Sequence, residues 1–447
     1  MIIKNREELI SSSLRARAVE LFESGIKRVL PGNLMQSAIK LNRRTRKLSV
    51  MGDTYEITRN RIFVIGGGKA SGQMAEELEK ILGPASITAG MVNCNSEGYS
   101  TEKISVIKAG HPLPDEAGVH GIQKMLAMKA RYDIGKGDLV ICLISGGGSS
   151  LMPCPVIGIT LEDQQEITQL LLRCGANIKE INTVRKHLSL TKGGNLGEFY
   201  DPATVVSLII SDVVGDDLDA IASGPTVPDS TTFKDAYAVL KKYGLLDKAP
   251  QHVTDHITRG CNDREAETPK TLGNCDNYII GNNRMALEAM AEKARDLGLK
   301  PFIVTAELTG DTAEMAYRLA DDMKTGHYRG FSVILLGGET TPTLSENAGK
   351  GGRNQHFAAV SMLAMQGLRS PWLVASAGTD GSDYLADIAG AMVDDRSLQQ
   401  AREIGINVDL YIEKFDSNSL FNTLGRSLII TGPTGTNVSD VILYLLG

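Results

Sequence analysis

The chain repeats one local pattern, in which a strand-like apolar run ends in a glycine-bearing loop and a helix-like segment follows. The clearest instance is RIFVIGGGKASGQMAEELEKIL at residues 61–82, and the others lie at 138–150, 204–217, 331–342 and 371–383. Continuous apolar strands need shielding on both faces, so the repetition predicts an α/β protein with parallel sheets covered by helices. Ligands of such sheets bind beyond the carboxyl ends of the strands, where these loops fall.

The length of the chain predicts two domains, because 447 residues exceed what one hydrophobic core usually organises. Residues 242–277 are polar, contain Pro250 and Pro269 and have no strong strand pattern. We therefore expect an α/β domain at residues 1–250 and, at 251–447, a linker followed by a second α/β domain. A cleft between the two domains is the expected position of a ligand site.

Composition and charge exclude several classes of protein. The chain is 42% hydrophobic, and no apolar stretch approaches the about 20 residues that span a membrane. Its net charge is −6 and no Lys/Arg stripe interleaves with aromatic residues, so a nucleic-acid partner is not expected. The charged, helix-periodic N-terminus is not a signal peptide, so we expect a cytoplasmic protein. The six cysteines show no C-x-x-C pair and no His at ligand spacing, which argues against zinc and disulfides.

The first glycine loop, VIGGGKAS, ends a predicted strand and opens a predicted helix. Glycines let an anion approach backbone N–H groups, and a helix N-terminus favours negative charge, so we expect Gly67, Gly68 and Ser71 to bind the ligand. Lys69 lies at the turn, where its ammonium would face the anion. Read as a dinucleotide fingerprint, the motif has Ser71 in place of the third glycine, and no acidic residue follows at the usual distance.

The second glycine loop, SGGGSS, has hydroxyls in place of the lysine. Gly146, Gly147 and Gly148 with Ser149 and Ser150 can surround phosphate oxygens with N–H and O–H donors. A tight turn alone accounts for one glycine and poorly for three. The chain has no G-x-x-x-x-G-K-[ST] motif, so a phosphate site here is not a Walker-type P-loop.

Charged residues follow both loops. NTVRKHLSLTKGG supplies Arg185 and Lys192, which we expect to bind substrate or ATP, whereas Lys186 and His187 between them fit a solvated face equally well. Asp212 ends a strand and is the expected magnesium ligand and catalytic carboxylate, because a carboxylate beside phosphate loops suits Mg²⁺. The nearby Asp216, Asp217 and Asp219 have a structural alternative, the capping of a helix.

The second half of the chain adds a further set of polar loops. Arg353 in GKGGRNQ stands out, because an arginine at a helix start is disfavoured unless an anion lies nearby. We expect Arg353 to be catalytic and Asn354 and Asp380 to bind substrate or ATP. Asp380 and Asp383 in SAGTDGSD either bind a metal, with Asp383 the chosen ligand, or hold the turn.

Eight motifs in fixed order now form a recognisable set: VIGGGKAS, AGHPLPDEAG, LISGGGSSL, INTVRKHLS with KGG, SDVVGDD with IASGPTVPD, GGET with GKGGRNQ, SAGTDGSD and TGPTGTNVSD. The set resembles the glycerate 2-kinases of the two-domain family whose C-terminal part is the MOFRL domain, from about residue 60 to 440. The resemblance implies a Rossmann-like N-terminal domain, a MOFRL domain, both three-layered α/β/α, and a site in the cleft. It further implies transfer of the ATP γ-phosphoryl group to the 2-hydroxyl of D-glycerate with Mg²⁺, and key roles for Lys69 and Arg353.

The chain departs from the family motif at one position, and its function, its oligomeric state and the roles of the two glycine loops have alternatives. The family usually continues GTDGxDG, whereas Tyr384 follows Asp383 here. An NAD(P)H-dependent hydroxypyruvate reductase and a non-catalytic binder of small phosphorylated acids are the alternative functions. A homodimer is one option for the oligomeric state, and the sequence does not decide which glycine loop holds ATP and which holds glycerate.

Overall fold

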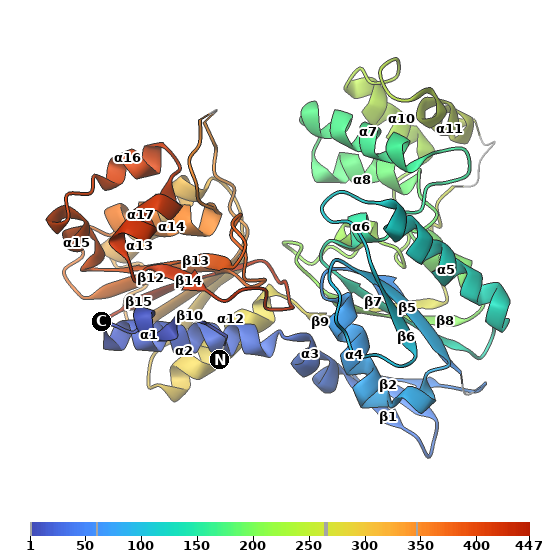
Figure 1. Cartoon of the computed structure of the whole chain (residues 1–447), viewed down its shortest axis with the longest axis horizontal. Coiled ribbons are helices and arrows are strands. Elements are labelled where there is room, and N and C mark those ends of the chain that lie inside the picture. Colours follow the sequence, from blue (N-terminus) through green and yellow to red (C-terminus); the bar gives the residue numbers. More distant parts are fainter. Residues whose placement is uncertain (1, 60, 263–266, 346) are drawn as a thin grey trace. The chain divides into compact units, whose positions relative to one another are not determined.

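The chain folds into two compact units, as seen in a computed structural model (Figure 1). The structure describes residues 2–59, 61–262, 267–345 and 347–447. Unit 1 combines Met1–Asn33 with Gly281–Gly447, and unit 2 comprises Leu34–Ile280. The chain passes from one unit to the other within helix α3 (Pro31–Ala38) and at the end of strand β9 (Cys275–Gly281).

The two units differ from the expected domains 1–250 and 251–447 at both ends. The first 33 residues belong to unit 1, and residues 251–280 belong to unit 2. A long-range ion pair explains the first difference: Arg15 in α2 (Ser13–Arg28) donates from Nε to Asp394 Oδ2 at 2.5 Å, and both side chains are buried. The second difference follows from β9, which forms the edge strand of the unit 2 sheet.

Unit 2 is built on a six-stranded sheet of order β6-β5-β4-β7-β8-β9. The strands are β4 (Ile62–Gly67), β5 (Ala89–Cys94), β6 (Ile104–Lys108), β7 (Leu139–Ser145), β8 (Thr204–Ile210) and β9. All pairs from β6 to β8 are parallel. The order is that of a Rossmann sheet. Strands β5 and β6 are added on one side of β4 and the later strands on the other side, so the topological switch point lies between β4 and β7, where such sheets bind ligands.

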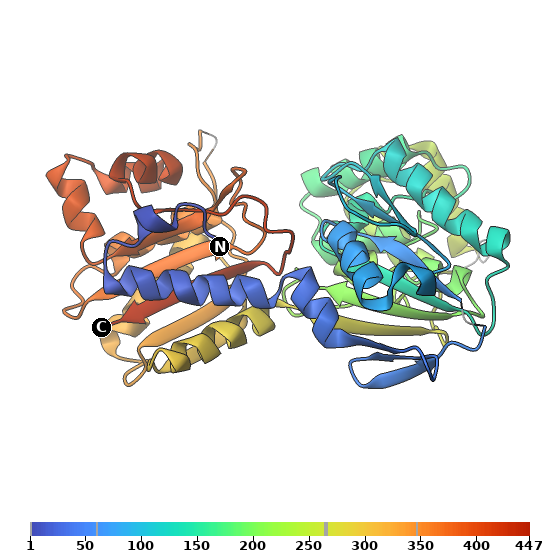
Figure 2. The ribbon, with the colours of Figure 1, turned by 60° about the horizontal axis from the view of Figure 1, so that its bottom comes forward.

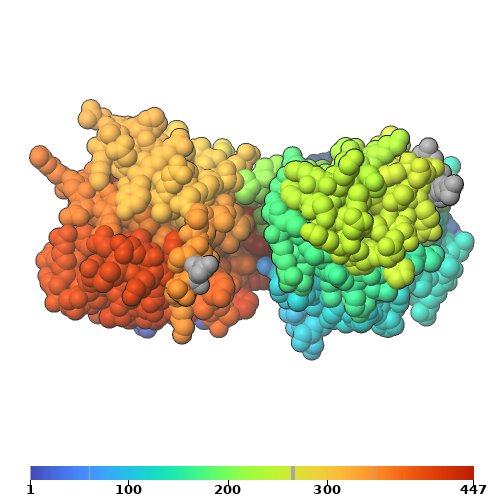
Figure 3. All heavy atoms as spheres, turned by 90° about the horizontal axis from the view of Figure 1, so that it is seen from above, coloured from blue at the N-terminus to red at the C-terminus, as the bar shows by residue number. Residues whose placement is uncertain are grey.

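The helices of unit 2 fall into two groups. The first packs near the sheet or in its loops: α4 (Ser71–Leu82), η1 (Pro84–Ser86), α5 (Glu116–Tyr132), α6 (Gly148–Leu151), α9 (Asn195–Phe199) and η2 (Ile221–Ser223). The second is α7 (Leu161–Arg173), α8 (Ile178–Lys186), α10 (Phe233–Lys242) and α11 (Gln251–Cys261). These four helices share their own core, which includes Ile167, Val184, Leu240 and Ile257 (Figure 1). The yellow-green segment of α10 and α11 covers the face of unit 2 seen in Figure 3.

A small antiparallel sheet completes unit 2. Its strands are β1 (Ile39–Asn42), β2 (Lys47–Val50) and β3 (Asp53–Glu56). It directly precedes β4 in the chain, so it leads the backbone into the central strand of the large sheet.

Unit 1 has a second six-stranded sheet, of order β10-β11-β15-β12-β13-β14. The strands are β10 (Pro301–Leu308), β11 (Val333–Gly338), β12 (Trp372–Gly378), β13 (Ile388–Asp394), β14 (Leu428–Ile430) and β15 (Asp440–Leu446). Only β10 and β11 pair in parallel, and the other pairs are antiparallel. The C-terminal strand β15 lies between β11 and β12, so this sheet differs from the parallel sheet that the repeated pattern predicts.

Helices cover both faces of the unit 1 sheet. Figures 1 and 2 show α2 and α12 (Asn283–Asp296) side by side on one face, where a Cβ at Gly25 would lie 2.7 Å from Met290 Cγ. The remaining helices are α1 (Arg6–Leu9), α13 (Thr312–Thr325), α14 (Arg353–Ala364), α15 (Ser397–Glu403), α16 (Val408–Glu413) and α17 (Ser417–Leu424). Helices α13 and α14 pack on the opposite face (Figure 1). The predicted class, three-layered α/β/α units, is confirmed. None of the helices described here is long and apolar enough to cross a membrane.

The buried Arg15–Asp394 pair predicts a large effect on stability. Arg15→Leu leaves the Asp394 carboxylate buried without its cation, so we expect the free energy of unfolding to fall by about 3 kcal/mol or more. Glu20→Gln on the same helix is the control, because Glu20 forms a partly exposed ion pair with Lys293, which is worth less than about 1 kcal/mol. Denaturant unfolding measures both, and equal small losses would contradict the anchoring role of Arg15.

Candidate active site

Strands β4 and β7 approach each other closely enough that only glycine fits at their ends. A Cβ at Gly66 would lie 2.1 Å from the carbonyl oxygen of Leu143, and one at Gly68 would lie 2.2 Å from Ser145 Oγ. Both glycines have positive φ, +132° and +155°. The glycines of the first loop therefore serve the contact between two strands, and not the approach of a ligand to the backbone.

The amide groups of the first loop are already hydrogen-bonded within unit 2. Gly68 N donates to Asn93 O at 3.2 Å, Lys69 N to Gly146 O at 2.8 Å and Ala70 N to Ser145 Oγ at 2.9 Å. These bonds consume the donors that a nucleotide phosphate or a dinucleotide would need. The backbone anion site expected at this loop is therefore not present in the structure.

Gly67 and Ser71 are also buried within unit 2. Gly67 is buried at the end of β4, and a Cβ there would lie 2.5 Å from Met152 Cγ. Ser71 is fully buried, and its Oγ donates to Leu143 O at 3.1 Å. With Gly68 they hold the loop in place, which corrects their expected role as ligand-binding residues. The side chain of Lys69 is partly exposed and is what the first loop presents outward.

This interpretation predicts that the first loop tolerates no side chain at Gly68. Gly68→Ala creates a backbone clash and a strained φ, so we expect the free energy of unfolding to fall by more than about 3 kcal/mol. Gly158→Ala is the control, since Gly158 has φ +89° but no neighbouring atom within 4 Å of a Cβ, and strain alone costs about 1–2 kcal/mol. If thermal unfolding shows equal losses for the two variants, the contact between β4 and β7 is not what requires Gly68.

The second glycine loop gathers three of the predicted groups. A Cβ at Gly146 would lie 1.9 Å from Asp212 Oδ2, so the Asp212 carboxylate lies directly over that glycine. A Cβ at Gly147, which has φ +80°, would lie 3.2 Å from Lys69 Cγ and 2.9 Å from His111 Nε2. Lys69 and Asp212 thus flank the loop at the point where the sheet changes direction, as the sequence predicts.

The rest of the loop begins helix α6. Gly148 packs against Ala222, and the amides of Ser150 and Leu151 both donate to Gly147 O at 3.1 Å. Ser149 Oγ shares a hydrogen bond of 2.6 Å with Ser223 Oγ. Ser150 is largely buried, and its Oγ donates to Gly147 O at 3.0 Å. Gly147, Gly148 and Ser149 stay candidates for ligand binding, whereas Ser150 closes the turn.

His111 is a candidate site residue that the sequence analysis missed. Burial, together with the Lys69 charge, lowers the pKa of its imidazole to about 4. It is therefore neutral at pH 7 and can accept a hydrogen bond beside the Gly147 loop. A signal was available, because His111 follows strand β6 and so falls at the same edge of the parallel sheet as the glycine loops.

Arg185 and Lys192 converge on one carbonyl group beside the glycine loop. Lys192 Nζ donates to Ser149 O at 2.7 Å, and Arg185 Nη2 donates to the same oxygen at 3.2 Å. Within the residues that the structure describes, neither forms an ion pair with a carboxylate. Burial and the neighbouring Arg185 hold the pKa of Lys192 well below its usual value, and burial lowers the pKa of Arg185 to about 10.

These two cations line a cavity of about 290 Å³ that also contains Ser149, Ser150 and Gln165. Two like charges removed from water without a counter-ion are unfavourable on their own. A small anion in this cavity would neutralise both charges. The sequence prediction that Arg185 and Lys192 bind an anion is therefore supported by their geometry.

The uncompensated charge predicts opposite effects on stability and binding. Lys192→Met removes a buried charge while keeping most of the side-chain volume, so we expect the free energy of unfolding to rise by about 1 kcal/mol. We expect binding of inorganic phosphate to be lost. Calorimetric titration and thermal unfolding test the variant against Lys179→Met, an exposed lysine of α8 that should change neither quantity.

The pH dependence of the same variant provides a second readout. The pKa of Lys192 is lowered in the folded chain, so between that pKa and the ordinary value the unfolded chain binds more protons, and stability rises with pH. We expect Lys192→Met to flatten this rise. A variant that is less stable at every pH and still binds phosphate would show that the cation only supports the fold.

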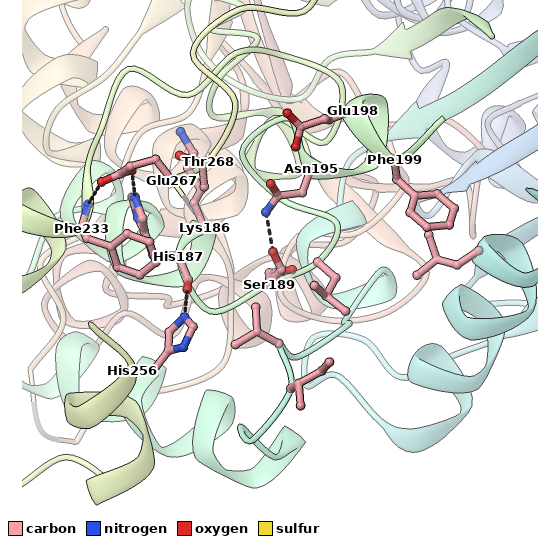
Figure 4. Close-up of a pocket in the computed structure, with 14 residues that line it drawn as sticks. Lys186, His187, Ser189, Asn195, Glu198, Phe199, Phe233, His256, Glu267 and Thr268 are labelled. Atoms are coloured by element: carbon pink, nitrogen blue, oxygen red, sulfur yellow. Dashed lines mark hydrogen bonds and ion pairs between the residues drawn. The ribbon is translucent and has the colours of Figure 1, made fainter. Parts of the chain in front are cut away.

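Lys186 and His187 are not solvated, although they stand between Arg185 and Lys192 in sequence. Lys186 is 1% exposed, forms an ion pair with Asp219 and lies 3.3 Å from Asp229 Oδ1. His187 Nε2 lies 3.3 Å from Glu267 Oε2. Figure 4 shows both residues at a separate cavity of about 490 Å³.

Packing and hydrogen bonds among the residues of that second cavity hold its wall in place. The ring of His187 packs edge-on against Phe233, and His256 Nε2 bonds to the backbone carbonyl of His187 at 3.0 Å (Figure 4). The pairing of Asp219 with Lys186 replaces the helix-capping alternative for that aspartate. The cavity contains none of the predicted catalytic residues.

Arg353 is held by two carboxylates of unit 1. Its Nε and Nη2 donate to Asp440 at 2.5 and 3.0 Å, and Nη1 lies 2.9 Å from Glu339 Oε1. These groups meet at one edge of the sheet, because β11 ends at Gly338 and β15 begins at Asp440. The anion that an arginine at a helix start requires is thus supplied by the chain itself. Arg353 stays partly exposed, so its remaining N–H donors face outward.

Asp383 and Asn354 are buried at the start of α14. Asp383 accepts hydrogen bonds from the backbone N–H groups of Asn354 and Gln355 at 3.0 and 2.8 Å, and from both amide side chains. Burial raises the pKa of Asp383 to about 6. Asn354 Oδ1 accepts from Ser376 Oγ at 2.6 Å. The surroundings give Asp383 the role of a helix cap in place of a metal ligand, and Asn354 is 1% exposed with its side chain bonded to Asp383 and Ser376.

Asp380 holds a turn of the backbone at the end of β12. Asp380 Oδ1 accepts from Ser382 N at 2.9 Å, which fixes the turn after β12. The described part of the chain contains no group of three or more His, Cys, Asp or Glu side chains that could hold a metal ion. A protein-only cage of three or more such ligands is therefore not seen there, and a magnesium site would rest on Asp212 with oxygens of the substrate.

Comparisons with known proteins identify the family of the chain. Residues 17–258 match the family described as "Domain of unknown function (DUF4147)", and residues 332–440 match the MOFRL family. The chain is 39% identical to a "Glycerate 2-kinase" of Pyrococcus horikoshii over 98% of both chains. The chain belongs to the two-domain glycerate 2-kinase family.

Two further relatives show the range of the family. A "Putative hydroxypyruvate reductase" of Agrobacterium vitis is 39% identical over 90% of this chain and 91% of its own. The crystal structure of a glycerate kinase from Thermotoga maritima superposes with a TM-score of 0.84 at 35% identity, covering 97% of this chain and 100% of that chain. The fold and the family expected from the eight sequence motifs are confirmed.

Proposed function

We propose that the chain is a glycerate 2-kinase, which transfers the γ-phosphoryl group of ATP to the 2-hydroxyl of D-glycerate and yields 2-phosphoglycerate and ADP. The observation that carries the proposal is the cavity in which Arg185 and Lys192 lie without a carboxylate partner among the described residues, beside the glycine loop of β7. Its volume of about 290 Å³ suits a small carboxylic acid. We assign the carboxylate of glycerate to these two cations.

The reaction forms a bond between the 2-hydroxyl oxygen and the γ-phosphorus, and breaks the bond to the β,γ-bridging oxygen. Phosphoryl transfer depends on positioning and on charge neutralisation. Lys69, beside Gly147, would neutralise the transferred group, and the neutral His111 would accept a hydrogen bond from the 2-hydroxyl, whose proton is lost to a phosphate oxygen or to water. Magnesium, when bound, neutralises phosphate oxygens, and Asp212 over Gly146 is the carboxylate that would hold it.

Arg353 is the second cation that we assign to the phosphates of ATP. Asp440 and Glu339 orient its guanidinium, so its free N–H donors can meet phosphate oxygens without a change of rotamer. Lys69 and Arg353 belong to different units, and their joint action on one substrate stays a prediction. Gly147, Gly148 and Ser149 are the proposed backbone and hydroxyl donors. The occupied amides of the first loop argue against the nicotinamide-dependent alternative.

An assay that follows ADP release tests the function. We expect release that depends on both D-glycerate and Mg²⁺, with 2-phosphoglycerate as the product and no oxidation of NADH by hydroxypyruvate. Lys69→Ala should lower kcat by about 10²-fold or more, as the loss of one preorganised charge-stabilising group does. The control is Lys80→Ala, an exposed lysine of the adjacent α4.

Three results would contradict the proposal. NADH oxidation without ADP release would favour the reductase, and binding of phosphorylated acids without turnover would favour a binding protein. A Lys69→Ala variant as active as Lys80→Ala would remove Lys69 from the mechanism.

A further inference from the structure

Unit 1 contains a cavity beside Arg353 that the proposed chemistry uses only at one corner. Its volume is about 400 Å³, and its walls include Glu339, Gly352, His356, Tyr384 and Phe415. This size lies within the range of small-molecule sites in proteins. Two aromatic rings, an imidazole, a carboxylate and a guanidinium therefore face one space.

Both aromatic residues have a strained backbone. Tyr384 has φ +64° and Phe415 has φ +51°, and they are the only aromatic residues with positive φ in the described chain. A bulky side chain in this region costs about 1–2 kcal/mol. Tyr384 is 84% exposed, so its side chain gains little burial in this conformation, and the turn is held by the hydrogen bond from Leu385 N to Asp383 O. Strain of this kind gathers at ligand sites.

His356 supplies an independent observation. It is 4% exposed, and neither ring nitrogen forms a hydrogen bond with another described residue; Nδ1 in particular is buried without a partner. One face of its ring stacks on Phe415, with centroids 4.7 Å apart and planes 27° from parallel. Burial lowers the pKa of His356 to about 4, so the ring is neutral at pH 7 and carries one donor and one acceptor. A buried polar atom without a partner is unfavourable until a ligand provides one.

We propose that this cavity binds the purine base of the nucleotide. Phe415 and Tyr384 provide flat apolar faces on which a base stacks, and His356 offers a hydrogen-bond partner to a polar edge of the base. Arg353, in the same cavity, meets the phosphates, and the carboxylate of Glu339 can accept a hydroxyl of the ribose. The inference rests on the proposed function and assigns the nucleotide base to unit 1.

Tyr384 stands at a position whose backbone favours glycine. Glycine adopts φ +64° without strain, whereas tyrosine does not. The tyrosine of this chain is strained at this position, and its exposed side chain provides an aromatic face at the cavity. Tyr384→Gly therefore separates the two roles, because it relieves strain while removing the stacking surface.

Calorimetric titration with ADP, adenosine and inorganic tripolyphosphate tests the inference on the full chain. In Tyr384→Gly we expect the affinities for ADP and adenosine to fall on the order of tenfold, the effect of losing one stacking ring. Tripolyphosphate affinity should not change, and the unfolding temperature should not fall. Tyr317→Ala is the control, since Tyr317 is exposed on α13 and does not line the cavity.

A second variant tests the imidazole. His356→Phe keeps a stacking ring and removes the unpaired nitrogen atoms, so we expect stability to be retained while ADP affinity falls. ADP affinity equal to that of the unmodified chain in both variants would overturn the inference. If glycerate is phosphorylated and the Michaelis constant for ATP does not change in Tyr384→Gly, the inference alone fails. If Tyr384→Gly loses ADP binding but the unmodified chain phosphorylates no glycerate, the proposed function alone fails.

Discussion

The backbone contact between β4 and β7 determines most of what unit 2 can do. Gly66 and Gly68 let the two strands meet with no side chain between them, and Lys69 N bonds to Gly146 O across the junction. This contact fixes the first loop and closes its amides to ligands. The same contact holds the Lys69 side chain beside Gly147. One constraint thus converts what looks like a backbone anion site into a scaffold for a single ammonium group.

The charged side chains of the two units are organised in opposite ways. Arg353 is compensated by Asp440 and Glu339, which restrict its orientation. Arg185 and Lys192 share a carbonyl oxygen and have no described carboxylate partner, so their charge is left for a ligand. A cation that is paired with carboxylates lowers the stability of the fold little, and its pairing holds it in one orientation for a ligand. An uncompensated pair reduces stability and gains its partner only on binding, which gives the cavity a strong preference for anions.

Much of the fold could be predicted because its signals are local. The strand, glycine loop and helix recur within about 25 residues in accord with right-handed parallel connections, and they place Lys69, Gly147 and Asp212 at one edge. The errors concern distant contacts. The pairing of Arg15 with Asp394 joins residues 379 positions apart, and the insertion of β15 between β11 and β12 depends on the last strand of the chain. Likewise, no local pattern reveals that Ser71 and Asn354 point into the protein interior.

Four of the positions that cost the folded chain stability face the cavities. The unpaired charges of Arg185 and Lys192, the unpaired Nδ1 of His356 and the left-handed backbone of Tyr384 are each unfavourable without a ligand. Substitutions there that relieve the cost also remove what a ligand would contact. By contrast, Gly68 and Arg15 stabilise the fold and face no cavity of the proposed reaction. At Lys192 a gain of stability together with a loss of affinity therefore distinguishes a binding position from structural positions such as Gly68 and Arg15.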